Sequence, residues 1–467
     1  MSEPTVDLQA LAQKAGIAPE YVVPYGREVA KIELGALGSK EQKARYVVVT
    51  ATSPTPFGEG KTTTAIGLVQ GMAKIDRNAV LTIRQPAQGP VFGIKGGATG
   101  NGASQVEPAT LINLHLTGDF HAITAAHNLL SAIIDNHLYQ GNELEIEERS
   151  ITWPRVLDVN DRALRHIVTG LGGRIDGVTR QSSFDITPAS EVMVIMSLAT
   201  SLKDLRERLG RIVIGRSKSG KWITAEDLQA AGAMTALLRD ALQPNLLRTS
   251  ENTPVLIHTG PFGNIATGCS SVVADLIAAQ HADYVVTEAG FGADMGAERF
   301  FDLKCAVSGL RPHAAVLVTT VRSLKSHSGK FKITAGKGLP EQMLAESPQD
   351  VRAGQANLLK HIEIVRGFGM EPVVAINVFP TDHESELAEI EAIAREAGAR
   401  VARSYGVVRG GEGCTELAQA VEQACQDSEG QNQARPLYER EDDLKTKIAK
   451  VAAMYGADGV DYTPAAA

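Results

Sequence analysis

Cysteine is scarce in this chain, and its four cysteines stand far apart. Cys269, Cys305, Cys414 and Cys425 form no C-x-x-C pair. Closely paired cysteines are what zinc sites and disulfide frameworks usually show. We therefore expect four free thiols in a reducing compartment, which makes the cytoplasm the expected location.

Long apolar runs are also missing. No uninterrupted stretch reaches the roughly 20 apolar residues that a membrane-spanning helix needs. The start, "MSEPTVDLQALAQKAGIAPE", lacks the basic region and apolar core of a secretory signal. The sequence therefore predicts a protein without a membrane partner.

The chain has no long basic block, and its formal net charge is -8. This balance argues against nucleic acid as the main partner. A local group of four lysines, Lys325, Lys330, Lys332 and Lys337, lies in "LKSHSGKFKITAGKG". We favour a solvated loop there over a funnel for an anionic substrate. The nucleophile motif G-x-S-x-G is missing, which weakens hydrolase interpretations.

Six short runs rich in Val, Ile, Leu and Ala do not alternate apolar with polar residues. Such runs are typical of strands buried on both faces of a parallel sheet. Stretches of helical period separate them; residues 187–210 are expected to form one helix, capped by Thr187 with Pro188 in the first position. The alternation predicts an α/β fold: a P-loop-type, mostly parallel sheet flanked by helices, with additional α/β domains. The six runs are residues 46–52, 79–83, 255–258, 284–288, 315–321 and 373–377.

The length of 467 residues suggests roughly two to four domains. Residues 1–135 and 254–366 are expected to form a P-loop nucleotide-binding core. Residues 136–253 read as an inserted, helix-rich lobe. Residues 367–467 are expected to form a third α/β domain, which this chain would leave incomplete.

The stretch "VTATSPTPFGEGKTTTAIG", residues 49–67, contains the Gly-Lys-Thr that ends a phosphate-binding loop. Thr55 stands where the usual pattern has its first glycine. A predicted strand precedes the loop and a predicted helix follows it, which is the context such a motif requires. Backbone N–H groups at the helix start would hold a polyphosphate, with Lys61 on the outer phosphates and Thr62 on Mg²⁺. The loop thus predicts ATP or GTP binding without specifying a reaction.

A glycine-rich segment opens one strand later, at Arg84. Six glycines within 14 residues indicate a backbone that closely approaches a ligand, or a mobile lid. Arg84 and Lys95 supply positive charge, and arginine suits planar oxyanions such as carboxylate or phosphate.

Three histidines and an aspartate follow in "HLTGDFHAITAAHNLL": His115, Asp119, His121 and His127. Their spacing resembles a metal site only weakly. A helix through residues 122–134 would turn His127 away from His121, and H-E-x-x-H is missing. We favour polar loop contacts or acid/base work.

Polar and glycine-rich residues follow five of the predicted strands. In open α/β sheets, ligands bind outside the carboxyl ends of the strands. We therefore expect one composite site at that edge, although strand-to-helix loops are polar in general and this explains part of the pattern.

Several long motifs together resemble those of the formate–tetrahydrofolate ligase family, from about residue 30 to residue 463. The resemblance implies ATP-dependent joining of formate to N10 of tetrahydrofolate through formyl phosphate, giving ADP and phosphate. The motifs are "TPFGEGKTTT", "RQPAQGPVFGIKGGA", "NLHLTGDFHAITAAHNLL", "GPFGNIATGCSS", "VVTEAGFGADMGAERFF" and "AINVFPTD".

The resemblance also assigns residues. Lys61 and Arg84 would be catalytic, Arg84 by holding formyl phosphate, and Phe379 and Phe291 would bind folate. It further implies Mg²⁺ with ATP at Thr62, a monovalent cation and a homotetramer. The implied ATP-binding residues are Thr55, Pro56, Phe57, Gly58, Glu59, Gly60, Lys61 and Thr62.

The chain departs from the family in two places. Val407 in "YGVVRGGEG" replaces a tryptophan that faces the Phe379 position across the pterin, and family members continue beyond "GADGVDYTPAAA" with a glycine-rich segment. Two alternatives therefore stay open: an ATP-dependent small-carboxylate kinase that no longer uses folate, and a catalytically silent nucleotide-binding assembly protein.

Overall fold

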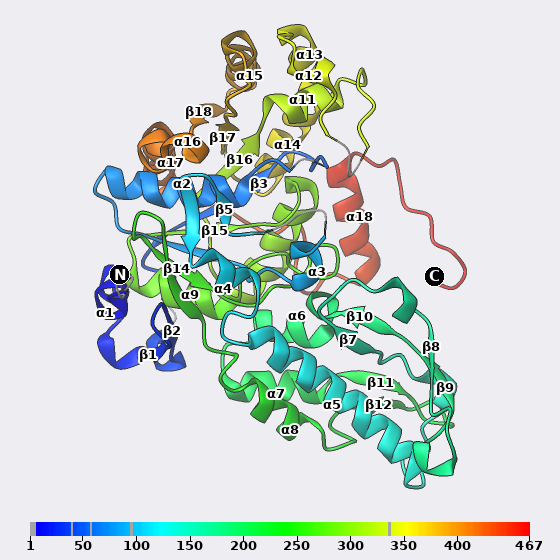
Figure 1. Ribbon diagram of the computed structural model, residues 1–467. Coiled ribbons are helices and arrows are strands. Elements are labelled where there is room, and N and C mark those ends of the chain that lie inside the picture. The colour runs from blue at the N-terminus through cyan, green and yellow to red at the C-terminus, as the bar shows by residue number, and fades with distance from the viewer. Residues whose placement is uncertain (1–5, 39–40, 57, 94–96, 335–337) are drawn as a thin grey trace.

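One large sheet runs through the centre of the chain (Figure 1). The computed structural model describes residues 6–38, 41–56, 58–93, 97–334 and 338–467. In these residues the sheet has 12 strands. They are β1 (Val22–Tyr25), β2 (Val29–Ile32), β3 (Arg45–Ala51), β4 (Ala79–Ile83), β5 (Gly100–Asn101), β6 (Ser104–Glu107), β13 (Asn245–Thr249), β14 (Pro254–Ile257), β15 (Tyr284–Glu288), β16 (Ala314–Thr319), β17 (Pro372–Asn377) and β18 (Arg400–Ser404).

The strand order is β1-β2-β13-β14-β4-β15-β3-β16-β17-β18, with β6 pairing with β13 and β5 with β6. The strands from β14 to β18 in this order are all parallel. The predicted α/β class with a mostly parallel sheet is confirmed, and each of the six predicted runs is one of these strands. The antiparallel strands β1, β2 and β13 were not predicted.

The strands are apolar throughout because both faces of the sheet are covered. Along β3, Tyr46 and Val48 pack into one hydrophobic cluster, whereas Val47 and Val49 pack into another. Side chains alternate between the two faces of a strand, so a strand that is buried on both faces needs apolar residues at every position.

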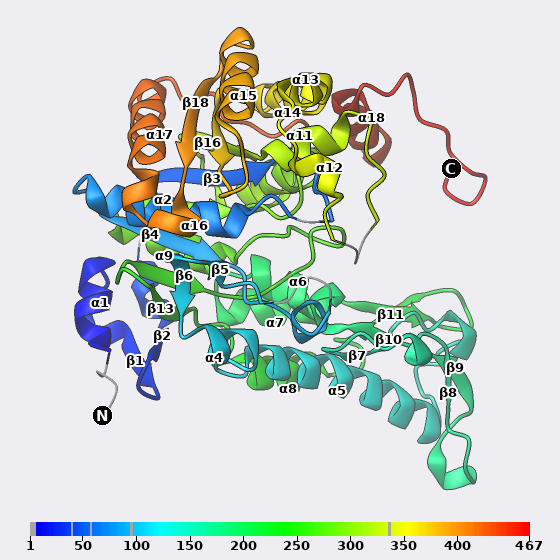
Figure 2. The same cartoon turned by 45° about the horizontal axis from the view of Figure 1, so that its top comes forward.

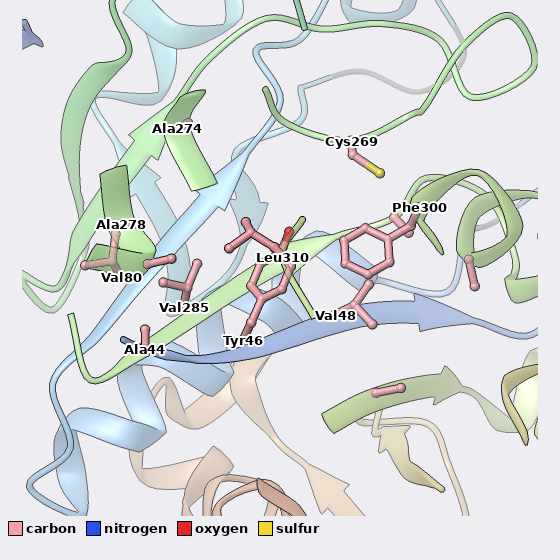
Figure 3. Close-up of a cluster of buried hydrophobic side chains, with 14 of the residues drawn as sticks. Ala44, Tyr46, Val48, Val80, Cys269, Ala274, Ala278, Val285, Phe300 and Leu310 are labelled. Atoms are coloured by element: carbon pink, nitrogen blue, oxygen red, sulfur yellow. The ribbon is translucent and has the colours of Figure 1, made fainter. Parts of the chain in front are cut away.

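The first cluster lies under four helices: α1 (Leu8–Lys14), α9 (Val272–His281), α14 (Gln355–Gly367) and α15 (Glu384–Glu396). Figure 3 shows part of it, with Tyr46 and Phe300 at its centre. The Tyr46 and Phe300 ring centroids are 5.6 Å apart. A buried ion pair crosses this apolar region, because Lys304 Nζ lies 2.5 Å from Asp275 Oδ2, and the Tyr46 hydroxyl donates to the same carboxylate.

The second cluster lies under α2 (Lys61–Lys74) and α17 (Thr415–Ser428). Helix α2 follows β3 and is buried along nearly its whole length. It packs against the sheet and against α17, which lies beside it on the same face of the sheet.

A third cluster forms a lobe to one side of the sheet (Figure 2). Its elements lie between residues 119 and 238. Whether this lobe and residues 367–467 are separate domains stays a prediction, although β17 and β18 belong to the central sheet. The lobe contains α5 (Asp119–Tyr139), α6 (Glu191–Leu198), α7 (Leu202–Gly210), α8 (Ala231–Leu238), β7 (Arg155–Leu157), β8 (Ile167–Thr169), β9 (Arg180–Ser182), β10 (Phe184–Ile186), β11 (Val213–Arg216) and β12 (Trp222–Thr224).

The single helix predicted for residues 187–210 is wrong. Residues 187–189 form a short 3-10 turn, and two helices follow, α6 and α7. Ser190 caps α6 by accepting a hydrogen bond from Met193 N, and Ser201 caps α7 by accepting one from Asp204 N. Serine at an N-cap satisfies a backbone N–H that the helix leaves free, so each serine begins a new helix.

The remaining helices are short or lie near the C-terminal end of the chain. Among the described segments, no helix has the length and apolar character needed to span a membrane. These helices are α3 (Gln88–Val91), α4 (Ala109–Asn113), α10 (Ala306–Ser308), α11 (Val321–His327), α12 (Glu341–Leu344), α13 (Pro348–Ala353), α16 (Gly406–Arg409) and α18 (Leu444–Tyr455).

The buried Lys304–Asp275 pair makes a test of stability. Asp275→Ala leaves the Lys304 ammonium without a counter-charge where water is excluded, which should cost about 3–5 kcal/mol. We expect a large fall in the urea midpoint, followed by circular dichroism. Glu207→Ala is the control, because the Lys203–Glu207 pair is exposed and worth less than about 1 kcal/mol. Equal losses in the two variants would contradict this account.

Candidate active site

The predicted nucleotide loop joins the carboxyl end of β3 to the start of α2. Gly58 and Gly60 have φ values of 72° and 74°, which glycine adopts without strain. Gly58 N donates to Thr55 O at 3.1 Å, and Thr64 N donates to Gly60 O at 2.9 Å as the helix begins. The loop therefore closes on itself through Thr55, the residue in place of the usual glycine. Phe57 lies outside the described residues.

Glu59 is folded into this loop and is 1% exposed. Its Oε1 accepts a hydrogen bond from Thr55 N at 2.6 Å. Burial raises the pKa of the Glu59 carboxyl, and the charge of Lys61 opposes that shift. Asn377, at the end of β17, donates through Nδ2 to Glu59 O at 3.1 Å. The loop is therefore attached to two strands. It follows β3 directly, and it is hydrogen-bonded to the end of β17, more than 300 residues further along the chain.

Thr62 contacts an acidic residue that the sequence did not single out. Its hydroxyl donates to Glu288 Oε2 at 2.6 Å. Glu288 ends β15, the strand hydrogen-bonded beside β3, and is 6% exposed. A hydroxyl at the helix start beside a carboxylate on the adjacent strand is the arrangement of the Mg²⁺ ligands in P-loop proteins. The sequence could have pointed to Glu288, because it is the last residue of a predicted strand and ligands bind at that end of a parallel sheet.

Arg84 follows β4, on the other side of β15 from the nucleotide loop. Its Nη1 donates to Pro261 O at 3.2 Å, and its Nε lies 4.0 Å from Glu288 Oε1. The guanidinium rests against Gly290, where an added Cβ would come within 3.0 Å of Arg84 Nη2. Glu288 therefore lies between Arg84 and Thr62.

Four buried polar atoms on Arg84 and on residues near it in the chain or the sheet have no hydrogen-bond partner among the described residues. They are Thr82 Oγ1, Arg84 Nε, Gln85 Oε1 and Thr259 Oγ1; Thr259 O accepts a hydrogen bond from Gln85 N. Buried polar groups are nearly always paired, so these four require an explanation. A small polar ligand beside Arg84 would provide one.

Phe379 follows β17 and is half-buried. The Arg322 guanidinium lies 3.9 Å from the centroid of the Phe379 ring, and Arg322 Nη2 donates to Thr381 Oγ1 at 3.1 Å. Burial lowers the pKa of Arg322. One face of the ring is therefore covered by a cation, as a cation–π contact requires.

Phe291 and Val407 lie at the same edge, after β15 and β18. Phe291 has a φ of 62°, and its ring packs against Gly263, where a Cβ would meet it at 2.7 Å. Val407 O accepts a hydrogen bond from Ala103 N at 2.9 Å. The folate-binding role of Phe379 and Phe291 stays a prediction.

The three histidines do not form one cluster. His115 Nδ1 and His121 Nε2 are 2.8 Å apart, whereas His127 Nε2 donates to Pro154 O at 3.0 Å inside the lobe. Asp119 pairs with Lys31 at 2.6 Å and accepts from Asn245 Nδ2 at 2.8 Å. Asp119 thus belongs to a buried ion pair rather than to a set with the histidines.

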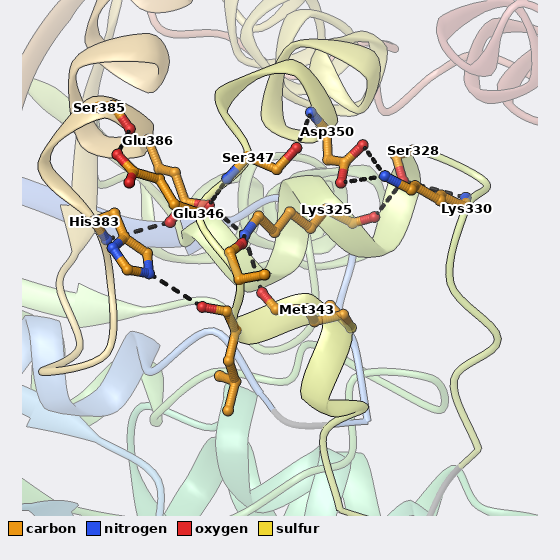
Figure 4. A network of polar contacts seen from close by, with 12 residues as sticks. Lys325, Ser328, Lys330, Met343, Glu346, Ser347, Asp350, His383, Ser385 and Glu386 are labelled. Atoms are coloured by element: carbon orange, nitrogen blue, oxygen red, sulfur yellow. Dashed lines mark hydrogen bonds and ion pairs between the residues drawn. The ribbon is translucent and has the colours of Figure 1, made fainter.

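The expected solvated lysine loop is wrong for one residue, Lys325 (Figure 4). Lys325 is 1% exposed, forms an ion pair with Glu386, and donates to Met343 O at 2.9 Å and Ala345 O at 2.8 Å. Lys330 is exposed and pairs with Asp350. Lys325 therefore fixes the segment before α13 onto α15. Lys332 is exposed, and Lys337 lies outside the described residues.

The fold and the loop define an α/β P-loop protein. A sequence model of the formate–tetrahydrofolate ligase family matches residues 2–467, and the chain belongs to this family. The predicted enzyme class is thereby confirmed.

Relatives named formate–tetrahydrofolate ligase are similar over almost the whole chain. The one from Cutibacterium acnes is 60% identical, over 98% of this chain and 82% of its own length. That from Saccharopolyspora erythraea is 59% identical, over 98% and 81%. That from Symbiobacterium thermophilum is 50% identical, over 97% and 80%.

His127 makes a test of acid stability. Burial lowers its pKa to about 4, because the charged ring would lose its hydration while Nδ1 has no hydrogen-bond partner among the described residues. The folded value is below the unfolded value near 6.5, so stability is complete above pH 6.5 and is lost as the pH falls toward 4. At about 1.4 kcal/mol per pKa unit, the loss is at most about 3 kcal/mol.

His127→Gln keeps a donor for Pro154 O and removes the titration. Its free energy of unfolding should fall less between pH 6.5 and 4 than that of the parent chain. His166→Gln, at an exposed histidine, should keep the parent's slope. Parallel slopes for all three proteins would show that His127 is not the group responsible.

Proposed function

We propose that this chain joins formate to N10 of tetrahydrofolate through formyl phosphate, converting ATP to ADP and phosphate. The observation that carries the proposal is that Glu288 lies between the two predicted ligand positions. It accepts from Thr62 at the nucleotide loop at 2.6 Å and lies 4.0 Å from Arg84 Nε. A phosphoryl group and a small carboxylate held at these two positions would lie side by side.

The nucleotide loop supports the first half of this proposal. Thr62 and Glu288 offer a hydroxyl and a carboxylate oxygen, the hard ligands that Mg²⁺ takes. Mg²⁺ bound with ATP would neutralise charge on the phosphates. Lys61 is the first residue of α2, where backbone N–H groups and the helix dipole favour phosphate.

The surroundings of Arg84 support the second half. Formate is a poor acyl donor, because its leaving group would be oxide, and phosphorylation replaces that group with phosphate. Arginine binds planar carboxylates and phosphates through two parallel hydrogen bonds. The unpaired oxygens of Thr82, Gln85 and Thr259 offer further contacts to a small polar ligand.

The surroundings of Phe379 support the folate-binding part of the proposal. With Arg322 on one face of its ring, Phe379 could stack on a flat heterocycle only through the opposite face. The monovalent cation, the homotetramer and the cytoplasmic location remain expectations from the sequence.

The second candidate is a small-carboxylate kinase that forms an acyl phosphate without folate. Val407 favours it, because valine offers no second ring for a pterin. A silent nucleotide-binding protein has less support, since Lys61, Thr62 and Arg84 are all retained.

The deciding experiment incubates the chain with formate, ATP, Mg²⁺ and tetrahydrofolate and measures 10-formyltetrahydrofolate and ADP separately. The proposal expects equal amounts of both. ADP that depends on formate, without the formylated product, would establish the kinase instead.

Two variants separate the two halves of the site in that assay. Lys61→Ala should abolish ADP formation while the circular dichroism spectrum stays the same. Arg84→Ala should bind ATP within about twofold of the parent but lose at least 100-fold in turnover, since arginine–oxyanion pairs are charge-assisted. Equal losses of binding and turnover in Arg84→Ala would count against a carboxylate-holding role.

A third variant tests the folate platform. Val407→Trp restores a ring at this position and should lower the Michaelis constant for tetrahydrofolate by roughly fivefold or more, since stacking is worth ~1–3 kcal/mol. The control is Val408→Trp, at the neighbouring position that is 61% exposed. An unchanged constant in Val407→Trp would mean that the substrate does not stack there.

A further inference from the structure

Asn377 connects the nucleotide loop to the segment that carries Phe379. It is the last residue of β17 and is 2% exposed. Its side-chain amide donates to Glu59 O at 3.1 Å, inside the loop. This is a hydrogen bond between a loop after β3 and the end of a strand two positions away in the sheet.

The contact is tight on the loop side. Gly60 has a φ of 74°, and a Cβ on it would lie 2.3 Å from Asn377 Nδ2. Glycine at position 60 therefore lets the amide approach the loop backbone. A shift of the Glu59–Gly60 peptide must move Asn377 or break the hydrogen bond.

The contact is also stiff on the Phe379 side. Val378 N donates to Ser404 O at 3.0 Å, and Phe379 N donates to Asp382 Oδ2 at 2.9 Å, which closes the turn after β17. Arg322 then holds the Phe379 ring at 3.9 Å. Only one residue separates Asn377 from Phe379. A displacement of Asn377 would therefore also displace Phe379.

We propose that Asn377 is a positioning residue that transmits occupancy of the nucleotide loop to the Phe379 ring. Formyl transfer requires the amine of the flat substrate to meet an acyl phosphate made at the loop, so the two sites must be held in register. This inference rests on the proposed function for the identity of the substrate at Phe379. The physical coupling itself needs only a nucleotide at the loop.

Hydrogen–deuterium exchange tests the coupling without any turnover. Addition of Mg²⁺ and a non-hydrolysable ATP analogue should slow exchange in the loop and, at least threefold, in residues 378–382. In Asn377→Leu, which keeps the shape of the side chain without a donor or a charge, protection should stay in the loop and vanish from residues 378–382. Asn377→Ser has a hydroxyl too short to replace the amide and should behave in the same way if the leucine variant folds poorly.

The matched control is Asn357→Ala. Asn357 also binds the chain near the loop, because its amide donates to Ser53 Oγ at 2.9 Å and its Oδ1 accepts from Ser53 N at 3.2 Å, but it extends from α14. This variant should keep the protection of residues 378–382. Protection there that survives in Asn377→Leu, or that is missing in the parent, would overturn the proposal. Loss of nucleotide binding in Asn377→Leu would do so too, because the amide would then be needed to form the loop.

Kinetics give a second readout. Asn377→Leu should raise the Michaelis constant for tetrahydrofolate roughly five- to tenfold, the effect of one hydrogen bond, and that for ATP less than twofold. Similar rises in both constants would indicate a general structural defect. If the parent makes no 10-formyltetrahydrofolate, the proposed function fails, while the exchange experiment still decides the coupling.

Discussion

The arrangement of the candidate site depends on the parallel alignment of β3 with its neighbours. Glu288 pairs in register with Val49, two residues before the end of β3, so the carboxylate reaches the nucleotide loop. Because parallel strands end at one edge, residues from distant parts of the chain meet there. Tyr46 and Val48 on one face, and Val47 and Val49 on the other, hold β3 between two hydrophobic clusters. The register that brings Glu288 to Thr62 is thus maintained by apolar packing on both sides.

Charge is balanced closely at this edge. Two carboxylates, Glu59 and Glu288, lie beside the positions proposed for phosphate, together with the cations Lys61 and Arg84. A polyphosphate next to two carboxylates is unfavourable unless further positive charge arrives with it. Burial raises the pKa of the Glu59 carboxyl, and the charge of Lys61 opposes that shift. A divalent cation bound together with the nucleotide would supply such charge, and Thr62 and Glu288 are the residues that would hold it.

The sequence predicts the buried parallel strands well, because burial on both faces leaves continuous apolar runs. It predicts the other elements poorly where the signal is short or polar. β18, "RVARS", has arginines at its first and fourth positions and therefore carries no such run. The break between α6 and α7 rests on Ser201, whose capping role is visible only once the backbone is known.

Long-range partners cannot be deduced from one sequence. Thr62 and Glu288 lie 226 positions apart, and Asn377 and Glu59 lie 318 apart. Lys325 looks like a solvated lysine because its buried partner, Glu386, is on another helix. The sequence does show which residue types follow each strand. Which of those residues are in contact depends on the order of the strands in the sheet.

The main chain at position 407 is held independently of its side chain. Val407 O accepts from Ala103 N, and an added Cβ on Gly102 would come within 2.0 Å of the same oxygen. The glycine-rich segment therefore contacts the backbone at position 407 whichever residue is present there. Valine in place of tryptophan would remove an aromatic ring without changing the path of the main chain. Arg322 already covers one face of Phe379, which leaves stacking on a single face. Under the proposed function, a ring at this position would add ~1–3 kcal/mol to folate binding. The hydrogen bonds given above for the nucleotide loop, in the part of the chain that the structure describes, involve other positions, so valine at position 407 would weaken folate binding and leave phosphate chemistry unchanged.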